Sequence, residues 1–219
     1  MKKNSNIIKK FSSLFLGFFL LSLGITSSLH ADLGMNPWGI FHMGIALQTG
    51  LTFGQAFQAA GTVIILLSIF LGIIPGIGTI LNMYFVGFFS DLISSSGLMF
   101  TPNTIIGKLI MLLIGNLIFA FGTYFYLKPG LGGGPKDSLM LAISKKFNYP
   151  ISIVRTVMEL IAVTIGTILG GPLGVGTLII AATTGYFIQG VCSFMNLNLK
   201  DTKQLNIIEF YKLLKAGEL

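Results

Sequence analysis

The stretch Leu33-Gly34-Met35-Asn36-Pro37 recurs 98 residues later as Leu131-Gly132-Gly133-Gly134-Pro135. In both places a glycine loop leads into a proline, and proline suits the first turn of a helix because the N–H groups there have no partner within the helix. The segments that follow, 37–49 and 135–147, would each form roughly 20 Å of helix. That length is too short for an easy crossing of a hydrocarbon core about 30 Å thick.

The same spacing of 98 residues relates other parts of the chain. Leu71-Gly72 falls on Leu169-Gly170, and the pair Gly17 and Gly24 falls on Gly115 and Gly122. We therefore predict two tandem repeats of about 98 residues. Further glycines match at the starts of apolar runs, where we expect them to end one helix and let a hairpin pack tightly; they are Gly76, Gly78, Gly174 and Gly176.

Six apolar runs have the length of a membrane-spanning helix, about 20 residues. In lipid, backbone groups must form hydrogen bonds within their own segment, so each run is expected to be helical. The predicted fold is an all-α, polytopic helical membrane protein in which each repeat has three long spans plus one short helix that begins with proline. The runs cover 11–29, 55–71, 77–93, 105–127, 151–169 and 173–195.

Composition points to the same environment. Hydrophobic residues make up 53% of the chain and charged residues only 10%, against about 25% charged in soluble domains. Such a chain has too little charge to cover a surface facing water, so lipid is its expected solvent. Cys192 is the only cysteine and the chain has two histidines. These numbers argue against a disulfide or a zinc site, and we expect no metal and no cofactor.

Positive charges flank the membrane part of the chain at both ends. Because such residues stay in the cytoplasm, both termini are predicted to be cytoplasmic. We divide the chain into a cytoplasmic N-terminus (1–10), membrane repeats (11–95 and 105–195) and an amphipathic cytoplasmic tail (197–219). The flanking residues are Lys2, Lys3, Lys9 and Lys10 before the first run, and Lys200, Lys203, Lys212 and Lys215 after the last.

The relative orientation of the two repeats stays open at this point. If the short helices do not cross the membrane, each repeat has three spans and the repeats are inverted; if they cross, the repeats are parallel. The first arrangement leaves only Lys108 outside, and the second leaves Lys128 and Lys136 outside. The distribution of positive charge therefore does not decide between them.

Arg155 and Glu159 are the strongest candidates for a functional site. They are four residues apart, so they share one face of a helix, and they lie near the start of an apolar span. Ionisable residues in a span are costly and point to function, which leads us to expect a buried ion pair. The alternative is a structural pair, or an arginine that reaches the headgroups.

The two glycine loops are the second candidate. Helix N-termini attract anions; Asn36 precedes one short helix, and Lys136 and Asp137 begin the other. The alternative is a tight turn between packed helices. His42 completes the predicted ligand-binding set, with packing as its alternative role. For Asn82, Asp91, Asn116 and Gln189 we expect hydrogen bonds between helices.

Several of these motifs resemble those of the YczE/YyaS/YitT-type bacterial membrane proteins, most closely the YczE branch. The resemblance rests on 31–38, on 132–137, on Arg155-Thr156 with Glu159, and on 170–177. It implies a multi-pass protein of the bacterial cytoplasmic membrane with an uncharacterised function, and it implies no catalytic residues.

The first repeat departs from the second where the charged residues lie. Gly39 stands at the position of Asp137, and Phe57 and Gly61 stand at the positions of Arg155 and Glu159. A charged site would therefore be asymmetric.

The leading functional hypothesis is a permease or exporter of an unknown small solute. The alternative is a membrane scaffold or accessory protein that assists another enzyme without transport. We do not expect an enzyme, because the chain lacks a Ser/His/Asp set, paired carboxylates and zinc spacing. The expected partner is the lipid bilayer. Nucleic acid is not expected, since no basic patch is interleaved with aromatics, and a homo-oligomer or a protein partner is left open.

Overall fold

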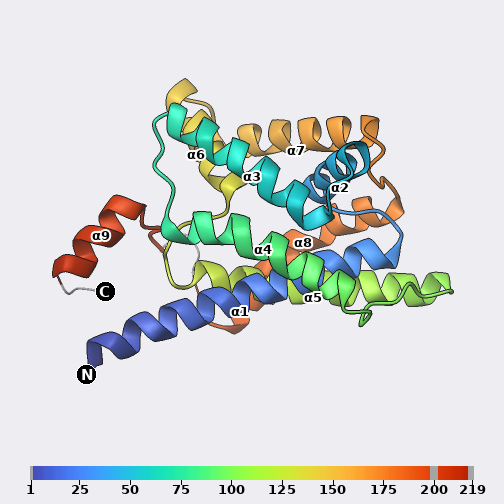
Figure 1. Cartoon of the computed structure of the whole chain (residues 1–219), viewed down its shortest axis with the longest axis horizontal. Helices are drawn as coiled ribbons and strands as arrows, with labels where there is room; N and C mark the ends of the chain where they lie inside the picture. The colour runs from blue at the N-terminus through green and yellow to red at the C-terminus, as the bar shows by residue number, and fades with distance from the viewer. Residues whose placement is uncertain (1, 198–201, 217–219) are drawn as a thin grey trace.

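A computed structural model describes residues 2–197 and 202–216, and every regular element in this part is a helix (Figure 1). Six helices are long and apolar enough to cross a membrane: the part of α1 from Ile7 to Ala31, α3, α4, α5, α7 and α8. The predicted all-α, six-span fold is thus confirmed. The helices are α1 Lys2–Ala31, α2 Pro37–Thr49, α3 Phe53–Phe70, α4 Ile77–Ser95, α5 Ile105–Leu127, α6 Pro135–Phe147, α7 Ile151–Ile168, α8 Val175–Phe194 and α9 Ile207–Ala216.

The predicted terminal segments are only partly described. The N-terminal segment 1–10 is helical from Lys2 onward as the beginning of α1. Met1, residues 198–201 with the flanking Lys200, and residues 217–219 of the predicted tail lie outside the described residues.

The two short helices have the predicted bounds, and local sequence explains why. Asn36 caps α2 by accepting a hydrogen bond from the N–H of Gly39 at 2.7 Å, which satisfies one of the unpaired donors at the helix start. Gly50 ends α2 in the left-handed conformation, at φ 71°. In the second half, Asn148 ends α6 in the same conformation. The helices that follow, α3 and α7, also correspond: their first residues are 98 positions apart, and so are their last residues.

The directions of the long helices answer the question of orientation. A Cβ added at Gly17 of α1 would lie 2.5 Å from Tyr126 near the end of α5. At the other end of the pair, Asp32, which follows α1, forms an ion pair with Lys108 near the start of α5. Helices α1 and α5 are therefore antiparallel, and the two halves are inverted with three long helices each.

Each half also supports the other through equivalent loop contacts. The N–H of Gly176 donates to the carbonyl oxygen of Leu33 at 2.6 Å, and the N–H of Gly78 donates to that of Leu131 at 2.8 Å. These donors and acceptors are related by the spacing of 98 residues. The glycine loop of one half thus satisfies a free N–H at the start of the last long helix of the other half.

Small residues bring α1 and α5 close together along a pseudo-two-fold axis. A Cβ added at Gly24 would lie 2.6 Å from the carbonyl oxygen of Gly115, and one added at Gly122 would lie 3.0 Å from that of Gly17. Close backbone approach of this kind is a general means of packing helices in lipid. These matched glycines place the axis between α1 and α5.

The helices form two layers (Figure 1). One layer holds α1, α4, α5 and α8, and the other holds α2, α3, α6 and α7, with α2 against α7 and α6 against α3. The layers meet where α3 packs on α4, since a Cβ at Gly87 would lie 2.5 Å from the carbonyl oxygen of Gly54. The counterpart of Gly87 on α8 is Gly185, and a Cβ there would meet no atom within 4 Å. The two layers are therefore tightly joined on one side only.

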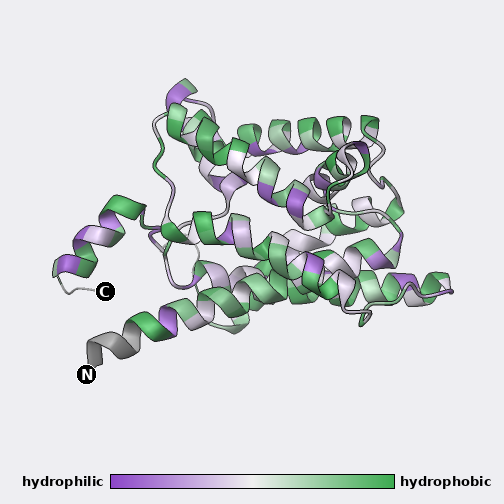
Figure 2. Ribbon diagram, viewed as in Figure 1, coloured by the Kyte–Doolittle hydropathy of each residue, from purple (hydrophilic) through white to green (hydrophobic). Residues whose placement is uncertain are grey.

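The outer surface is suited to lipid. Hydrophobic residues predominate over the long helices (Figure 2), and several on α7 point outward, among them Leu160 and Ile161. A surface of this kind would be unstable in water. The chain is a membrane protein whose long helices contact the lipid bilayer.

The tail packs beneath the bundle beside the N-terminal part of α1. Phe210 of α9 is buried and contacts the ring of Phe11 edge to face. Before α9 the chain runs as a strap across the second glycine loop, with the N–H of Leu205 bonded to the carbonyl oxygen of Gly130 at 2.8 Å. Both described ends of the chain therefore lie on the same side of the bundle.

Candidate functional site

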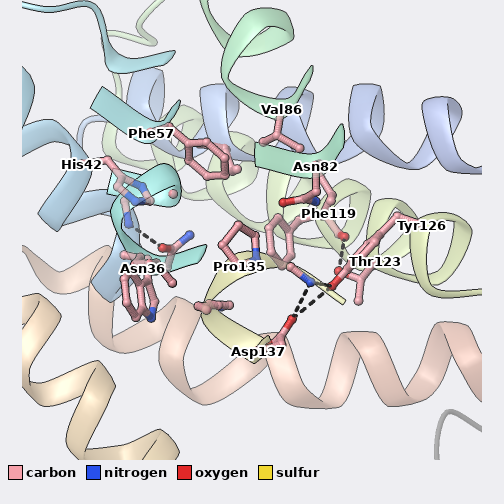
Figure 3. Close-up of a pocket in the computed structure, with 18 of the residues that line it drawn as sticks. Asn36, His42, Phe57, Asn82, Val86, Phe119, Thr123, Tyr126, Pro135 and Asp137 are labelled. Carbon is pink, nitrogen blue, oxygen red and sulfur yellow. Dashed lines mark hydrogen bonds between the residues drawn. The ribbon is translucent and has the colours of Figure 1, made fainter. Parts of the chain in front are cut away.

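A cavity of about 300 Å³ lies between the two layers. The first turns of the short helices α2 and α6 reach it, and residues of α1, α3, α4, α5, α7 and α8 complete its wall (Figure 3). Most of the wall is apolar. Cavities of this size that carry a few convergent polar groups are typical of small-molecule sites.

The first half contributes an amide, an aromatic ring and an imidazole from α2. Asn36 and Trp38 line the cavity at the start of this helix, and His42 follows one turn later. The His42 side chain is 5% exposed and lies against the ring of Phe57, with centroids 4.7 Å apart. Among the described residues it contacts aromatic rings and has no hydrogen-bond partner.

The second half contributes a carboxylate that is already well bonded. The Asp137 carboxylate accepts hydrogen bonds from the N–H of Gly134 at 3.1 Å and from the hydroxyl of Tyr126 at 3.2 Å (Figure 3). Its negative charge also lies at the positive end of α6. Lys136, the next residue back, lines the cavity too, and its ammonium group has no ionic partner in the described part of the chain.

Asn82 of α4 is a buried amide without a partner. Its side chain is 5% exposed, and its Oδ1 atom lies 3.6 Å from the position of a Cβ added at Gly134. No described residue forms a hydrogen bond with it, so the predicted interhelical hydrogen bond is wrong for this residue. Buried amides normally have partners, and this one faces the cavity (Figure 3).

Two of the other polar residues in the spans do form the predicted hydrogen bonds. Asn116 of α5 bonds to Thr183 and Thr184 of α8, each at 2.9 Å. Asp91 of α4 accepts from the N–H of Gly54 of α3 at 2.8 Å. These side chains hold helices together. Gln189 of α8 is exposed and, like Asn82, forms no hydrogen bond with a described residue, so the prediction is wrong for both.

Arg155 and Glu159 form the predicted pair on one face of α7, with Nε and Oε1 3.1 Å apart. The expectation of a buried pair is wrong, because the Arg155 side chain is 64% exposed and that of Glu159 is 36% exposed. The physical reason is that α7 does not pack against α8, so its face near the cavity stays partly open. Both residues contribute to the cavity wall at its rim.

The structure brings all six predicted ligand-binding residues into the wall of this one cavity. They are Arg155, Glu159, Asp137, Lys136, Asn36 and His42. That they bind a ligand stays a prediction. Sequence reasoning missed Trp38 and Tyr126 and gave Asn82 a different role. A signal existed for Trp38, which stands 98 residues before Lys136.

The cavity wall is made of matched positions from the two halves, which places it near the pseudo-two-fold axis. In the first half these positions are mostly aromatic or small, and in the second half several carry charge. The cavity is therefore lined by aromatic residues of the first half and by charged residues of the second. The matched pairs in the wall are Leu21 and Phe119, Ile25 and Thr123, Asn36 and Gly134, Trp38 and Lys136, Gly39 and Asp137, His42 and Met140, Phe57 and Arg155, and Gly61 and Glu159.

Sequence comparisons assign the chain to a family. Residues 8–193 match a family model described as "Family of unknown function (DUF6198)". The chain belongs to this family. It is 32% identical to the uncharacterized membrane protein YczE of Bacillus subtilis, over 84% of this chain and 85% of that protein.

Two further relatives have a similar extent. An uncharacterized protein of Haemophilus influenzae is 32% identical over 83% of this chain and 82% of its own length. The uncharacterized protein YyaS of Bacillus subtilis is 28% identical over 80% of this chain and 88% of its own length. The predicted resemblance is thus confirmed. No solved structure matches the chain.

Proposed function

We propose that this protein is a carrier for a small solute, with the central cavity as its solute site. The observation that carries the proposal is the position of the cavity between two inverted halves, at the point where both short helices begin. Many secondary transporters have this plan, with inverted repeats around a site formed by interrupted helices near the middle of the bilayer. The proposal includes no enzymatic activity.

We further propose that the protein lies in a bacterial cytoplasmic membrane with both termini in the cytoplasm. The charge distribution supports this orientation. Lys128 follows α5 at the end of the bundle where α1 begins, and Lys146 lies at the same end, against the ring of Phe70. Lys108 lies at the opposite end, where it is paired with Asp32.

The uneven contact between the layers supports a carrier over a static bundle. One layer holds the α1–α5 pair on the axis, and the other holds both short helices. Contact between the layers is tight at α3 and α4, whereas Gly185 of α8 has open space beside it. A small rocking of one layer against the other would change which end of the cavity is open, as alternating access requires.

Solute flux into proteoliposomes tests the proposal. The wild-type chain, Arg155→Ala and Glu159→Ala are compared with Lys145→Ala, whose side chain lies on α6 away from the cavity wall. We expect the wild-type chain and Lys145→Ala to transport a member of a broad panel of small organic solutes. The two variants in the wall should lose most of that flux while retaining their melting temperature.

Two outcomes would count against the carrier. Absence of flux for every solute in the panel would favour the non-transporting scaffold. Equal flux in all four proteins would remove the cavity from the pathway.

The orientation has its own test. In a Cys192→Ser background, single cysteines are placed at Gly50 and at Lys128, and intact cells are treated with a thiol reagent that does not cross membranes. Labelling is expected at position 50 and not at position 128, and the reverse pattern would contradict the proposed orientation.

A further inference from the structure

We infer that the cavity takes a small amphipathic organic anion, with a carboxylate held by Lys136 and an apolar body held by the aromatic side of the wall. This inference rests on the proposed function and adds the chemical class of the solute. It follows from which groups in the wall already have partners and which do not.

The wall carries two cations and two carboxylates, and among these four side chains only Lys136 has no bonded partner in the described part of the chain. Glu159 is paired with Arg155 at 3.1 Å, and the Asp137 carboxylate is held by an N–H and a hydroxyl. Lys136 lines the same cavity and has no ionic or hydrogen-bond partner among the described residues. Lys136 is an exposed residue whose ammonium is free to bind, and the carboxylate of a ligand in the cavity would provide a counter-charge through a charge-assisted hydrogen bond.

Two polar side chains in the wall also lack a hydrogen-bond partner. The Asn82 amide and the His42 imidazole are each 5% exposed, line the cavity and have no hydrogen bond within the described part of the chain. Their polar atoms are accessible from the cavity, so a ligand there can form hydrogen bonds with them. Both can donate to an oxygen atom, so they suit the carboxylate or a second polar group of the same ligand.

The rest of the wall selects the body of the ligand. Trp38, Phe53 and Phe57 from α2 and α3 line the same cavity as the charged residues of α6 and α7. Aromatic rings bury large apolar area and pack well against flat or branched hydrocarbon groups. About 300 Å³ is the space of roughly ten water molecules, which fits a phenyl ring with a short side chain.

The same aromatic rings invite the opposite reading, an organic cation held by cation–π contacts. Three features of the wall argue against it. Both carboxylates already have partners, Lys136 would repel a second cation, and the positive ends of α2 and α6 point toward the cavity. An anion would be attracted both by Lys136 and by these helix ends.

Trp38 makes the inference testable by direct binding, because it is the only tryptophan of the chain and lines the cavity. The purified full chain in detergent is titrated with three probes of one shape: 3-phenylpropionate, 3-phenylpropanamide and 3-phenylpropylamine. Tryptophan emission reports occupancy. We expect the carboxylate to bind at least about tenfold more tightly than the neutral amide or the amine, as loss of a charge-assisted hydrogen bond predicts.

Lys136→Gln should remove this preference, so that the carboxylate binds about tenfold more weakly and no better than the amide. Lys145→Gln on the same helix changes the net charge equally, lies outside the cavity wall and should bind like the wild type. Thermal unfolding of both variants shows that each is folded.

The inference is overturned if the amine binds as tightly as the carboxylate, if Lys136→Gln keeps full affinity, or if the carboxylate does not change the emission up to its solubility limit. These outcomes can be told apart from a failure of the carrier proposal. Anion binding without flux would retain the ligand class and reject transport, whereas flux of a cation without anion binding would do the opposite.

Discussion

At the scale of single residues, one amino acid has different roles in the two halves because its neighbours differ. Gly87 lets α4 approach α3 so closely that a Cβ would lie 2.5 Å from the carbonyl oxygen of Gly54. Gly185 is its match on α8, and a Cβ there would meet nothing within 4 Å. The spacing of 98 residues relates the two glycines, but only one of them is needed for packing.

Gly87→Ala and Gly185→Ala therefore form a matched pair of substitutions. We expect Gly87→Ala to lower stability by about 2 kcal/mol, since the clashing atom belongs to the backbone of α3 and a helix must shift. Gly185→Ala should be neutral or stabilising by up to about 1 kcal/mol through helix propensity. Thermal unfolding in one detergent measures both, and equal losses would refute the asymmetric contact between the layers.

Sequence reasoning at this scale found which residues meet but not how they are buried. The spacing of Arg155 and Glu159 predicted their pairing, because four residues separate them on one helix. Their exposure depends on whether α7 packs against α8, which no local pattern reveals. Asn82 was assigned a hydrogen bond for a similar reason, since a polar residue in a span usually finds a partner on a neighbouring helix.

At the scale of elements, the short helices were the most predictable part of the fold. Pro37 and Pro135 define their first turns, and Gly50 and Asn148 end them in the left-handed conformation. These are local signals, so the bounds follow from the chain itself. The site near the first turns was predictable for the same reason, whereas the contribution of Tyr126 depends on how α5 packs.

The strap before α9 could not be predicted, because it depends on contacts between distant segments. Gln204 bridges two parts of the second half: it accepts from the N–H of Gly132 at 3.1 Å and donates to the carbonyl oxygen of Leu127 at 3.1 Å. The N–H of Ile207 then donates to Pro75 at 3.0 Å. The tail thereby fixes the loop that leads into α6.

Protonation of one carboxylate is expected to loosen this tail. The N–H of Asn206 and the ammonium of Lys203 lower the pKa of Glu209 from its ordinary range. A lowered pKa in the folded state stabilises α9 above the unfolded value, about 4.3, and that stabilisation is lost as the pH falls through the folded pKa. Amide hydrogen exchange across 203–216 should therefore accelerate in acid.

Glu209→Gln is the control for this prediction, because it keeps the acceptor oxygen and removes the charge. Its tail should exchange faster at neutral pH and should respond less to acid. If the variant and the wild type have the same pH profile, another group controls the tail.

At the scale of the whole molecule, the arrangement of the halves was beyond sequence reasoning. Positive charge was compatible with both inverted and parallel repeats, since Lys108 and Lys128 exchange sides between them. The contact of Gly17 with Tyr126 and the pairing of Asp32 with Lys108 decide for inversion. These are pairings between distant segments, which a single sequence does not specify.

Movement between the layers can be tested by cross-linking. In a Cys192→Ser background, cysteines replace Thr62 of α3 and Met83 of α4, whose Oγ1 and Sδ atoms are 3.1 Å apart. Oxidation should join the layers and stop solute flux, and reduction should restore it. We expect a large loss, because rocking of the layers requires α3 and α4 to turn against each other at this contact, and the disulfide prevents that turn.

A second pair of cysteines controls for the effect of cross-linking itself. The Nδ2 atom of Asn116 on α5 and the Oγ1 atom of Thr183 on α8 are 2.9 Å apart, and both helices belong to one layer. A disulfide between them should leave flux largely unchanged. If both disulfides stop flux, or neither does, the layers are not the moving units.

An odd number of crossings in each half means that the second half enters the bilayer upside down relative to the first. A half made as a separate polypeptide would have to insert in both directions to assemble the same bundle from two copies. Joining the halves in one chain removes that need. Unequal lysine content on the two sides then suffices to give every molecule the same orientation.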